Sequence, residues 1–390
     1  MFKPYDIAPG SVNILIGPNG SGKSTLLRQW CEKLKVSSQT VLAMSPSIYD
    51  RFVGMRGWNF KYYGARQGRS AASKVIRDAL LKAYNDDPKF LKAVTKSLKY
   101  VNFDGKIGIR IKIKSLRPED IGVPPPEMKE RRRAKYTDEM YYALSNWDKL
   151  SSHYEHAIVP FELDRFSVGE LRQLSQVSIL ENEEQLKSLK LISKVEYFFF
   201  RHGKPIPLME ACSGELSFIA GLTFLAVNIT EGAVIAIDEP ENSLHPNWQK
   251  DYVEKLLDLL HNYQPKIVIA THSPIIISGA QLESAKGDFS APIHVYQIDN
   301  KIAEPFAHEK LSLEEMYDEL FGIITPKNHH LSQSAVELLN EMNAGKRSYE
   351  SVVDELLSMK TKCYDEVQKG AIMKMMKLAE KLQSEDTQES

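Results

Sequence analysis

Short runs of apolar residues recur along the chain, and each run ends in glycine, acidic or other polar residues. They cover residues 11–16, 40–44, 233–237 and 266–270. Runs of this kind are typical of strands that are buried on both faces of a parallel sheet. Because helix-compatible segments follow several of them, we predict an α/β core whose strands present polar residues at their carboxyl ends.

Other patterns lie between these runs. The isoleucines at 107, 109, 111 and 113 alternate with glycine or basic residues, which predicts a half-buried strand with a basic outer face. Strands are also expected at residues 190–200 and in a short segment running toward Met209, and an apolar helix packed on the sheet at 216–229. Further helices are expected at residues 23–35, 70–84, 88–99, 137–153 and 167–180, then at 311–321, 333–342, 349–359 and 364–383.

A glycine-punctuated loop follows the first apolar run and precedes a helix. It consists of Gly17, Pro18, Asn19, Gly20, Ser21, Gly22, Lys23, Ser24 and Thr25. Its glycines permit positive φ values, and the amides of the loop and of the helix start can face one anion. We expect Lys23 to reach the β- and γ-phosphates of ATP, and the Ser24 hydroxyl to bind the Mg²⁺ that bridges them. The pattern predicts a P-loop NTPase.

Acidic and imidazole side chains end two of the later strands. Asp238 and Glu239 follow the run at 233–237, at the sheet edge where ligands bind in α/β folds. Asp238 is expected to hold Mg²⁺, and Glu239 to orient or deprotonate the attacking water. His272 ends the next strand and would project toward the γ-phosphate. Glu239, His272 and Lys23 are therefore the candidate catalytic residues.

Ser213, Gly214 and Glu215 begin the apolar helix and form a second candidate anion site, because the N–H groups and dipole of a helix N-terminus favour a negative ligand. One nucleotide does not need two such cradles in one chain. A head-to-tail pair of chains does, because each copy presents its Ser213 and Gly214 to the triphosphate of the other. The sequence therefore predicts a homodimer around ATP, or a higher oligomer.

Composition sets limits on partners and location. The 390 residues include 50 basic and 51 acidic side chains, so bulk attraction to nucleic acid or membrane is not indicated, although local patches remain possible. Cys31, Cys212 and Cys363 lie far apart, which argues against a zinc site or a disulfide framework and fits a reducing compartment. Because we find no hydrophobic signal-peptide region at the N-terminus and no apolar run long enough to span a bilayer, we expect a soluble cytoplasmic protein.

Three segments outside these motifs have open interpretations. Residues 45–69 interleave aromatic residues with arginines, which suits either stacking on nucleic acid or, as we favour, a hydrophobic hinge under an insertion. Residues 130–135 form a basic run that is either a solvated surface, the favoured interpretation, or a phosphate contact. Residues 122–126, rich in proline, mark a linker or the edge of a lid.

Together these elements resemble the ABC-type ATPase head of the SMC/RecF/OLD superfamily (AAA_21-like). Residues 17–25 match its Walker A motif, 213–215 its signature, 238–239 its Walker B motif with the catalytic glutamate, 241–246 its D-loop, and His272 its switch histidine. The resemblance covers residues 1–305 and implies an ATP-sandwiched dimer whose opening and closing is tied to hydrolysis. The glutamine loop of the family is not placed, with Gln67 as the candidate.

The resemblance also implies a division of the chain. Residues 1–69 and 190–305 are expected to form the ATPase core, residues 70–189 a mainly helical insertion that acts as a lid or arm, and residues 306–390 a helical tail for which partner docking is one of two open interpretations. Within the superfamily, the segments at 212–215, 238–241 and 244–246 look most like the stand-alone ATPase subunits of Septu and retron-associated anti-phage systems. That likeness implies an ATPase that regulates an effector, a nuclease or toxin encoded nearby.

Alternatives remain open for the activity and for the tail. The chain could be a RecF-like ATPase that binds DNA through residues 131–135 or 107–114, or an ATP-binding scaffold with negligible turnover. A nuclease site in the tail would depend on His329, His330 and Glu337 alone. The last helix carries an apolar stripe that either packs on the core or docks an effector or a second protomer: Tyr364, Val367, Ala371, Met375, Leu378 and Leu382.

Overall fold

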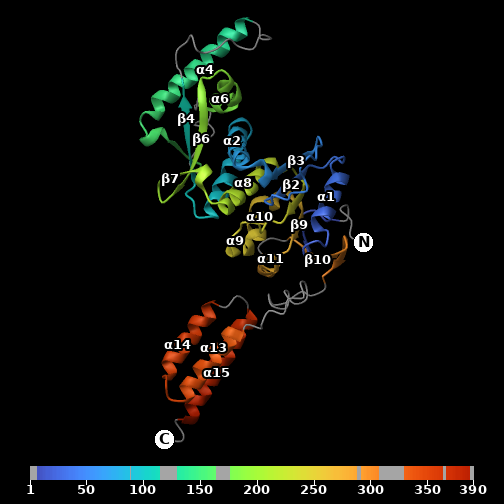
Figure 1. Cartoon of the computed structure of the whole chain (residues 1–390), viewed down its shortest axis with the longest axis vertical. Coiled ribbons are helices and arrows are strands. Elements are labelled where there is room, and N and C mark those ends of the chain that lie inside the picture. The colour runs from blue at the N-terminus through green and yellow to red at the C-terminus, as the bar shows by residue number, and fades with distance from the viewer. Residues whose placement is uncertain are drawn as a thin grey trace. The chain divides into compact units, whose positions relative to one another are not determined.

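The computed structural model describes residues 7–87, 89–114, 130–163, 176–287, 291–306, 329–362 and 366–386. The chain divides into two compact units, Met1–Phe306 and Ala307–Ser390. Each unit has its own hydrophobic core. The first unit holds two sheets with their helices, and the second holds three described helices (Figure 1).

The central sheet of the first unit has seven strands in the order β11-β10-β1-β9-β8-β2-β3. Neighbouring strands are parallel except β11, which runs antiparallel to β10. The strands β1, β2, β8 and β9 coincide with the four predicted apolar runs and are buried almost throughout. The bounds are β1 (Val12–Ile16), β2 (Val41–Ser45), β3 (Phe60–Gly64), β8 (Val234–Asp238), β9 (Lys266–Thr271), β10 (Ile293–Asp299) and β11 (Ile302–Pro305).

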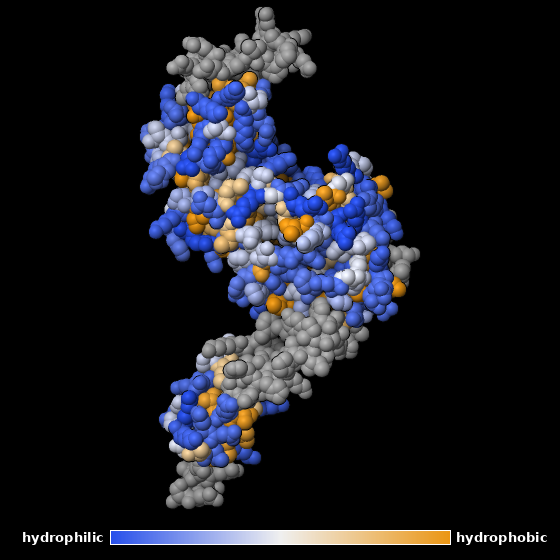
Figure 2. All heavy atoms as spheres, viewed as in Figure 1, coloured by the Kyte–Doolittle hydropathy of each residue, from blue (hydrophilic) through white to orange (hydrophobic). Residues whose placement is uncertain are grey.

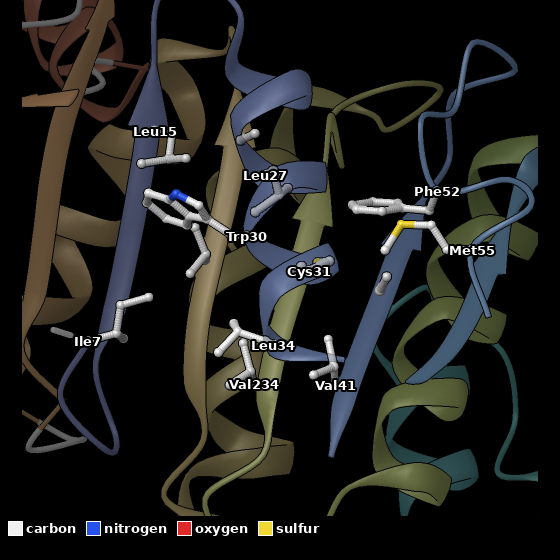
Figure 3. Close-up of a cluster of buried hydrophobic side chains, with 14 of the residues drawn as sticks. Ile7, Leu15, Leu27, Trp30, Cys31, Leu34, Val41, Phe52, Met55 and Val234 are labelled. Carbon is white, nitrogen blue, oxygen red and sulfur yellow. The ribbon is translucent and has the colours of Figure 1, made fainter. Parts of the chain in front are cut away.

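One face of this sheet is covered by α1 (Lys23–Leu34) and by the connection from β2 to β3. Figure 3 shows α1 directing Leu27, Trp30 and Leu34 onto this face. Phe52 and Met55 of the connection complete the same buried cluster. The cluster packs α1 on this face of the sheet, and α1 begins seven residues after the end of β1.

Helices α8 (Ser213–Asn228), α10 (Tyr252–Leu260) and α11 (Pro274–Lys286) lie on the opposite face. The helix α8 contacts β2 and β3, and α11 contacts β10. Helices α2 (Arg69–Asn85) and α3 (Lys89–Lys99) cover the other side of α8, which is therefore buried on nearly all sides. The apolar helix predicted at 216–229 thus lies in the core as expected.

A second sheet departs from the expected division of the chain. It is antiparallel, in the order β5-β4-β6-β7, with β4 (Lys106–Ile113), β5 (Val159–Glu162), β6 (Ile192–Arg201) and β7 (Lys204–Pro207). We expected residues from 190 onward in the ATPase core, but β6 and β7 belong to this sheet. The pairing sets Ile107 and Ile109 of β4 opposite Phe199 and Tyr197 of β6, which joins two apolar faces into one. Helices α4 (Glu130–Ser151), α6 (Gln176–Glu181) and α7 (Glu183–Ser188) accompany the sheet.

The aromatic segment at 45–69 is divided between core and surface. Phe52, Phe60 and Tyr63 are buried, which agrees with the hydrophobic interpretation. Tyr49 and Trp58 are 82% and 78% exposed. The segment also forms β3, which the sequence did not predict. Hydrophilic side chains predominate on the face seen in Figure 2, with scattered hydrophobic ones. No helix among the described residues is long and apolar enough to cross a membrane.

The second unit consists, where described, of α13 (His329–Asn343), α14 (Tyr349–Lys362) and α15 (Glu366–Asp386). The face of α15 that is buried against α13 and α14 contains Ile372 and Ala379. The predicted stripe is therefore offset: Met375 and Leu382 are partly buried in this core, whereas Leu378 is 47% exposed. The predicted helix at 311–321, the segment at 122–126, and the side chains of 130–135, His329, His330, Tyr364 and Val367 lie outside the described residues.

Candidate nucleotide site

The strand order brings the predicted site residues to one edge of the central sheet. Strand β9 lies between β1 and β8, and β2 lies on the other side of β8, so the carboxyl ends of all four meet. A cavity of about 710 Å³ opens there. It is lined by Asn19, Gly20, Gly22, Lys23, Ser24, Thr25, Pro46, Ser47, Ile48, Tyr49, Arg51, Asp238, Glu239, Asn242, Ser243 and His272.

The loop from Gly17 to Thr25 has the backbone that its glycines predict. Gly20 and Gly22 have φ values of 87° and 97°, and α1 begins directly after Gly22. A Cβ atom on Gly17 would lie 2.6 Å from the carbonyl oxygen of Ile298, so only glycine fits at this position. The loop therefore ends with the N-terminus of α1 facing the cavity, as anion binding requires.

The ammonium group of Lys23 is folded against this loop. Its Nζ donates to the carbonyl oxygens of Gly17 at 2.7 Å and Pro18 at 3.0 Å. Burial lowers the pKa of Lys23, while the charges of Glu239, Glu241 and Asp238 oppose that shift. An ammonium group held at the loop beside its backbone is suited to bind phosphate oxygens.

Asp238 lies at the end of β8, only 2% exposed. Burial, together with the charges of Glu239, Asp50 and Glu241, raises its pKa to about 7, although a hydrogen bond from the Ser24 hydroxyl opposes the shift. Its Oδ1 atom has no hydrogen-bond partner among the described residues. A buried carboxylate with a free oxygen beside a hydroxyl fits a hard cation such as Mg²⁺.

The protein alone offers that cation few ligands. No group of three or more His, Cys, Asp or Glu side chains is arranged to hold a metal within the described part of the chain. Magnesium sites of this type use one or two protein oxygens together with substrate phosphates and water. The pair Ser24 and Asp238 agrees with that pattern.

Glu239 follows β8 in a left-handed conformation, with φ of 50°. Its N–H donates to the carbonyl oxygen of Ala270 on β9 at 2.8 Å, which fixes the turn. Its carboxylate Oε2 accepts a hydrogen bond of 2.9 Å from the side-chain amide of Asn242. The backbone of Glu239 is therefore held by β9, and its carboxylate by Asn242.

His272 lies at the end of β9 and is held by Glu241. The backbone N–H of His272 donates to Glu241 Oε1 at 2.7 Å, and its Nδ1 lies 3.1 Å from the same oxygen. The side chain of Glu241 is only 5% exposed, and burial raises its pKa. The imidazole, in contrast, is 37% exposed and lines the cavity.

The residues 213–215 lie outside this cavity. Ser213 is exposed, and a Cβ on Gly214 would lie 2.1 Å from the carbonyl oxygen of Ser243. We expected Glu215 among the nucleotide-binding residues, but its carboxylate is engaged within the chain. Its Oε1 pairs with Arg201 of β6 at 2.6 Å, and its Oε2 accepts from the N–H of Cys212 at 3.2 Å. Glu215 therefore caps α8 and ties it to the second sheet.

Sequence reasoning missed two groups of residues at the cavity. The loop of residues 46–51 follows β2, the strand beside β8, and contributes Ser47, Tyr49 and Arg51 to the lining. It occupies the place expected for the glutamine loop and contains no glutamine, whereas Gln67 is exposed and does not line the cavity. The second group is Glu241 and Asn242, which the resemblance assigned to the D-loop without a role at the site; Asn242 lines the cavity, and Glu241 contacts His272. Pro46 and Ser47, which follow the second apolar run, could have indicated a loop at the carboxyl end of that strand.

Two family models match the chain. The model described as "ABC transporter" matches residues 4–186, which include the loop from Gly17 to Thr25. The model described as "AAA domain, putative AbiEii toxin, Type IV TA system" matches residues 118–278, which include Ser213, Asp238 and His272. No curated protein matches the chain. The two models together include every predicted site residue.

Proposed function

We propose that the chain hydrolyses ATP with Mg²⁺ in a dimer that encloses the nucleotide. Its fold and its two family matches support a P-loop ATPase of the ABC/AAA type. The observation that carries the proposal is the convergence of Lys23, Asp238 and Glu239 in one cavity. These groups supply the three requirements of hydrolysis: a cation for the phosphates, an acid for the metal and a base for the water.

Each side chain then has a role that its surroundings support. Lys23 exchanges its two carbonyl acceptors for the β- and γ-phosphate oxygens, and the amides of the loop bind the same anion. Ser24 and Asp238 would hold Mg²⁺, which when bound neutralises charge that develops on the phosphates. Glu239, with its carboxylate fixed by Asn242, orients the attacking water and accepts its proton. His272, at the end of the neighbouring strand β9, contacts the γ-phosphate.

The dimer is inferred from the position of the α8 N-terminus. Ser213 is exposed, and neither Ser213 nor Gly214 lines the cavity of its own chain. The dipole of a long helix favours an anion at its N-terminus, and a second copy can present the exposed Ser213 to the open cavity of the first. Each nucleotide site would then be complete only in the dimer, because Ser213 and Gly214 come from the other copy.

Measurements of phosphate release from ATP and of dimer formation test this proposal. Glu239→Gln is expected to reduce steady-state hydrolysis by a hundredfold or more and to accumulate an ATP-bound dimer in sedimentation analysis, because the base is lost while binding remains. Ser213→Arg is expected to prevent that dimer. Glu231→Gln, an exposed glutamate before β8, serves as the matched control. Wild-type hydrolysis by Glu239→Gln would refute the catalytic assignment.

We further propose that the ATPase regulates an effector, a nuclease or toxin, in anti-phage defence in the cytoplasm. The support is the sequence resemblance at residues 238–246, the family description that names a toxin and a type IV system, and a second compact unit outside the ATPase unit. The DNA-maintenance alternative is not favoured: Arg110 of β4, one of the basic residues that would carry it, is paired with Glu196. Purification of the native complex with its neighbouring gene products tests the regulatory role.

A further inference from the structure

The turn that follows β8, residues 239–244, touches three parts of the candidate site. Asn242 donates to the carboxylate of Glu239 at 2.9 Å. Glu241 accepts from the backbone of His272 at 2.7 Å. The carbonyl oxygen of Ser243 lies against Gly214 so closely that a Cβ there would approach to 2.1 Å. One short turn therefore connects the base, the histidine and the start of α8.

This turn is tied to the end of β9 by more than the backbone bond from Glu239 to Ala270. Besides the Glu241 contact, Gln249 bridges the two segments: its Nε2 donates to the carbonyl oxygen of Leu244 at 3.0 Å, and its Oε1 accepts from the Ser273 hydroxyl at 2.8 Å. Ser273 directly follows His272. A displacement of the turn would therefore displace the histidine as well.

The turn is also held in a conformation that non-glycine residues rarely adopt. Glu239 and Ser243 have φ values of 50° and 69°. Left-handed backbone of this kind is strained for residues that carry a Cβ atom, and it persists where surrounding contacts fix it. The side chains of Glu241 and Asn242, which lie between these two residues in the chain, supply two such contacts.

We propose that Asn242 and Glu241 are positioning residues for ATP hydrolysis. Asn242 fixes the carboxylate of Glu239 toward the attacking water, and Glu241 fixes His272 toward the γ-phosphate. Neither binds the nucleotide directly, so their loss lowers the rate of the chemical step and leaves ATP affinity nearly unchanged. The inference rests on the proposed roles of Glu239 and His272.

Variants of Asn242 test the first half. Asn242→Asp keeps the shape but loses the donor, and Asn242→Ala removes the group. Both are expected to lower kcat by about tenfold to a hundredfold, with KM for ATP within about threefold of wild type, because a hydrogen bond to a charged group is lost. Asn242→Gln keeps an amide donor and is expected to recover part of the rate. Asn85→Ala, which removes an exposed amide bond to Glu181, is the matched control and is expected to keep the wild-type rate.

A double variant separates positioning from general stability. If Asn242 acts through Glu239, then adding Asn242→Ala to Glu239→Gln produces no further loss of kcat, because the base is already absent. Additive losses in the double variant, or a wild-type kcat in Asn242→Asp, would overturn the role of Asn242. A different result would refute the proposed function itself, namely normal ATP hydrolysis by Glu239→Gln alone.

Variants of Glu241 test the second half. Glu241→Gln keeps the oxygen that accepts the His272 N–H, so kcat is expected within about twofold of wild type. Glu241→Leu removes that acceptor and is expected to lower kcat about as much as His272→Ala, with no further loss when the two are combined. Should Glu241→Leu not fold, Glu241→Asp, whose shorter side chain withdraws the acceptor, replaces it with the same expected loss. A wild-type kcat in Glu241→Asp, or a tenfold loss in Glu241→Gln, would contradict an acceptor role.

Discussion

At the residue scale, the buried carboxylate of Asp238 links the site to pH. Its folded pKa of about 7 lies above the value of an unfolded aspartate, because burial penalises the charge. The folded state therefore retains a proton that the unfolded state has lost, and ionisation of Asp238 destabilises the fold progressively as pH rises from about 4 to 7. The charge that destabilises the fold is the same charge that would bind the cation.

Asp238→Asn removes this penalty. Without nucleotide or Mg²⁺, the variant is expected to be more stable than wild type by on the order of 2 to 4 kcal/mol at pH 8, and the difference is expected to shrink as pH falls from 7 toward 4. Urea unfolding at pH 8 and pH 5 measures both values. Asp86→Asn, at an exposed site, is the control. A difference that grew toward acid pH would show that Asp238 is not a destabilised acid.

Lys23 gives a second residue-scale prediction. Lys23→Met keeps most of the apolar stem but loses the ammonium group that faces the phosphate loop. ATP affinity is expected to fall at least about tenfold, because a charge-assisted contact with the phosphates is lost. Titration with a fluorescent ATP analogue measures the effect. Lys33→Met, on the exposed side of the same helix, is expected to bind normally; equal losses in both variants would contradict a specific role.

At the scale of elements, α8 depends on its close contact with the turn after β8. Gly214→Ala would place a Cβ 2.1 Å from the Ser243 carbonyl oxygen, so either the helix start or the turn must shift. We expect thermal destabilisation of about 1 to 3 kcal/mol and a loss of ATPase activity larger than this destabilisation explains. Gly370→Ala, a helical glycine of α15 with open space around it, is expected to be neutral or stabilising. An unchanged Gly214→Ala enzyme would argue against the contact.

Most elements near the site could be predicted from sequence, because the signals there are local. The strands β1, β8 and β9 are apolar runs that end in functional side chains, and the glycines of residues 17–22 predict the loop between β1 and α1. Parallel strands then place those ends at one edge of the sheet whatever their exact order. These features required no knowledge of which strands are neighbours.

The features that the sequence did not predict depend on long-range pairing. The pairing of Glu215 with Arg201 depends on β6 joining the second sheet, which no local pattern indicates. Likewise, residues 46–51 line the cavity because β2 happens to pair with β8, with Met44 opposite Ile237. In α15, Ile372 and Ala379 face the core because α13 and α14 cover that side, although the sequence offered a stronger stripe nearby. Helical spacing alone cannot choose between adjacent faces.

At the scale of the whole molecule, the two compact units predict separable functions. The second unit buries its own apolar cluster, with Val352 and Leu356 fully buried. Leu356→Ala is therefore expected to destabilise this unit by about 2 to 5 kcal/mol through the cavity it leaves. Because the nucleotide cavity is lined by residues of the first unit only, ATP affinity and hydrolysis are expected to stay within about twofold of wild type.

A fragment of residues 1–306 extends this test to the proposed effector. It should fold, bind ATP and hydrolyse it, because its two sheets and their helices form one compact unit. If the tail docks the partner, the same fragment should no longer co-purify with the effector, and Leu356→Ala should weaken that association at temperatures where only the second unit unfolds. Limited proteolysis and differential scanning calorimetry, each with and without ATP, identify which transition responds to nucleotide. If the fragment still co-purifies with the effector, the docking surface must lie in the first unit, and the second sheet would be the next region to test.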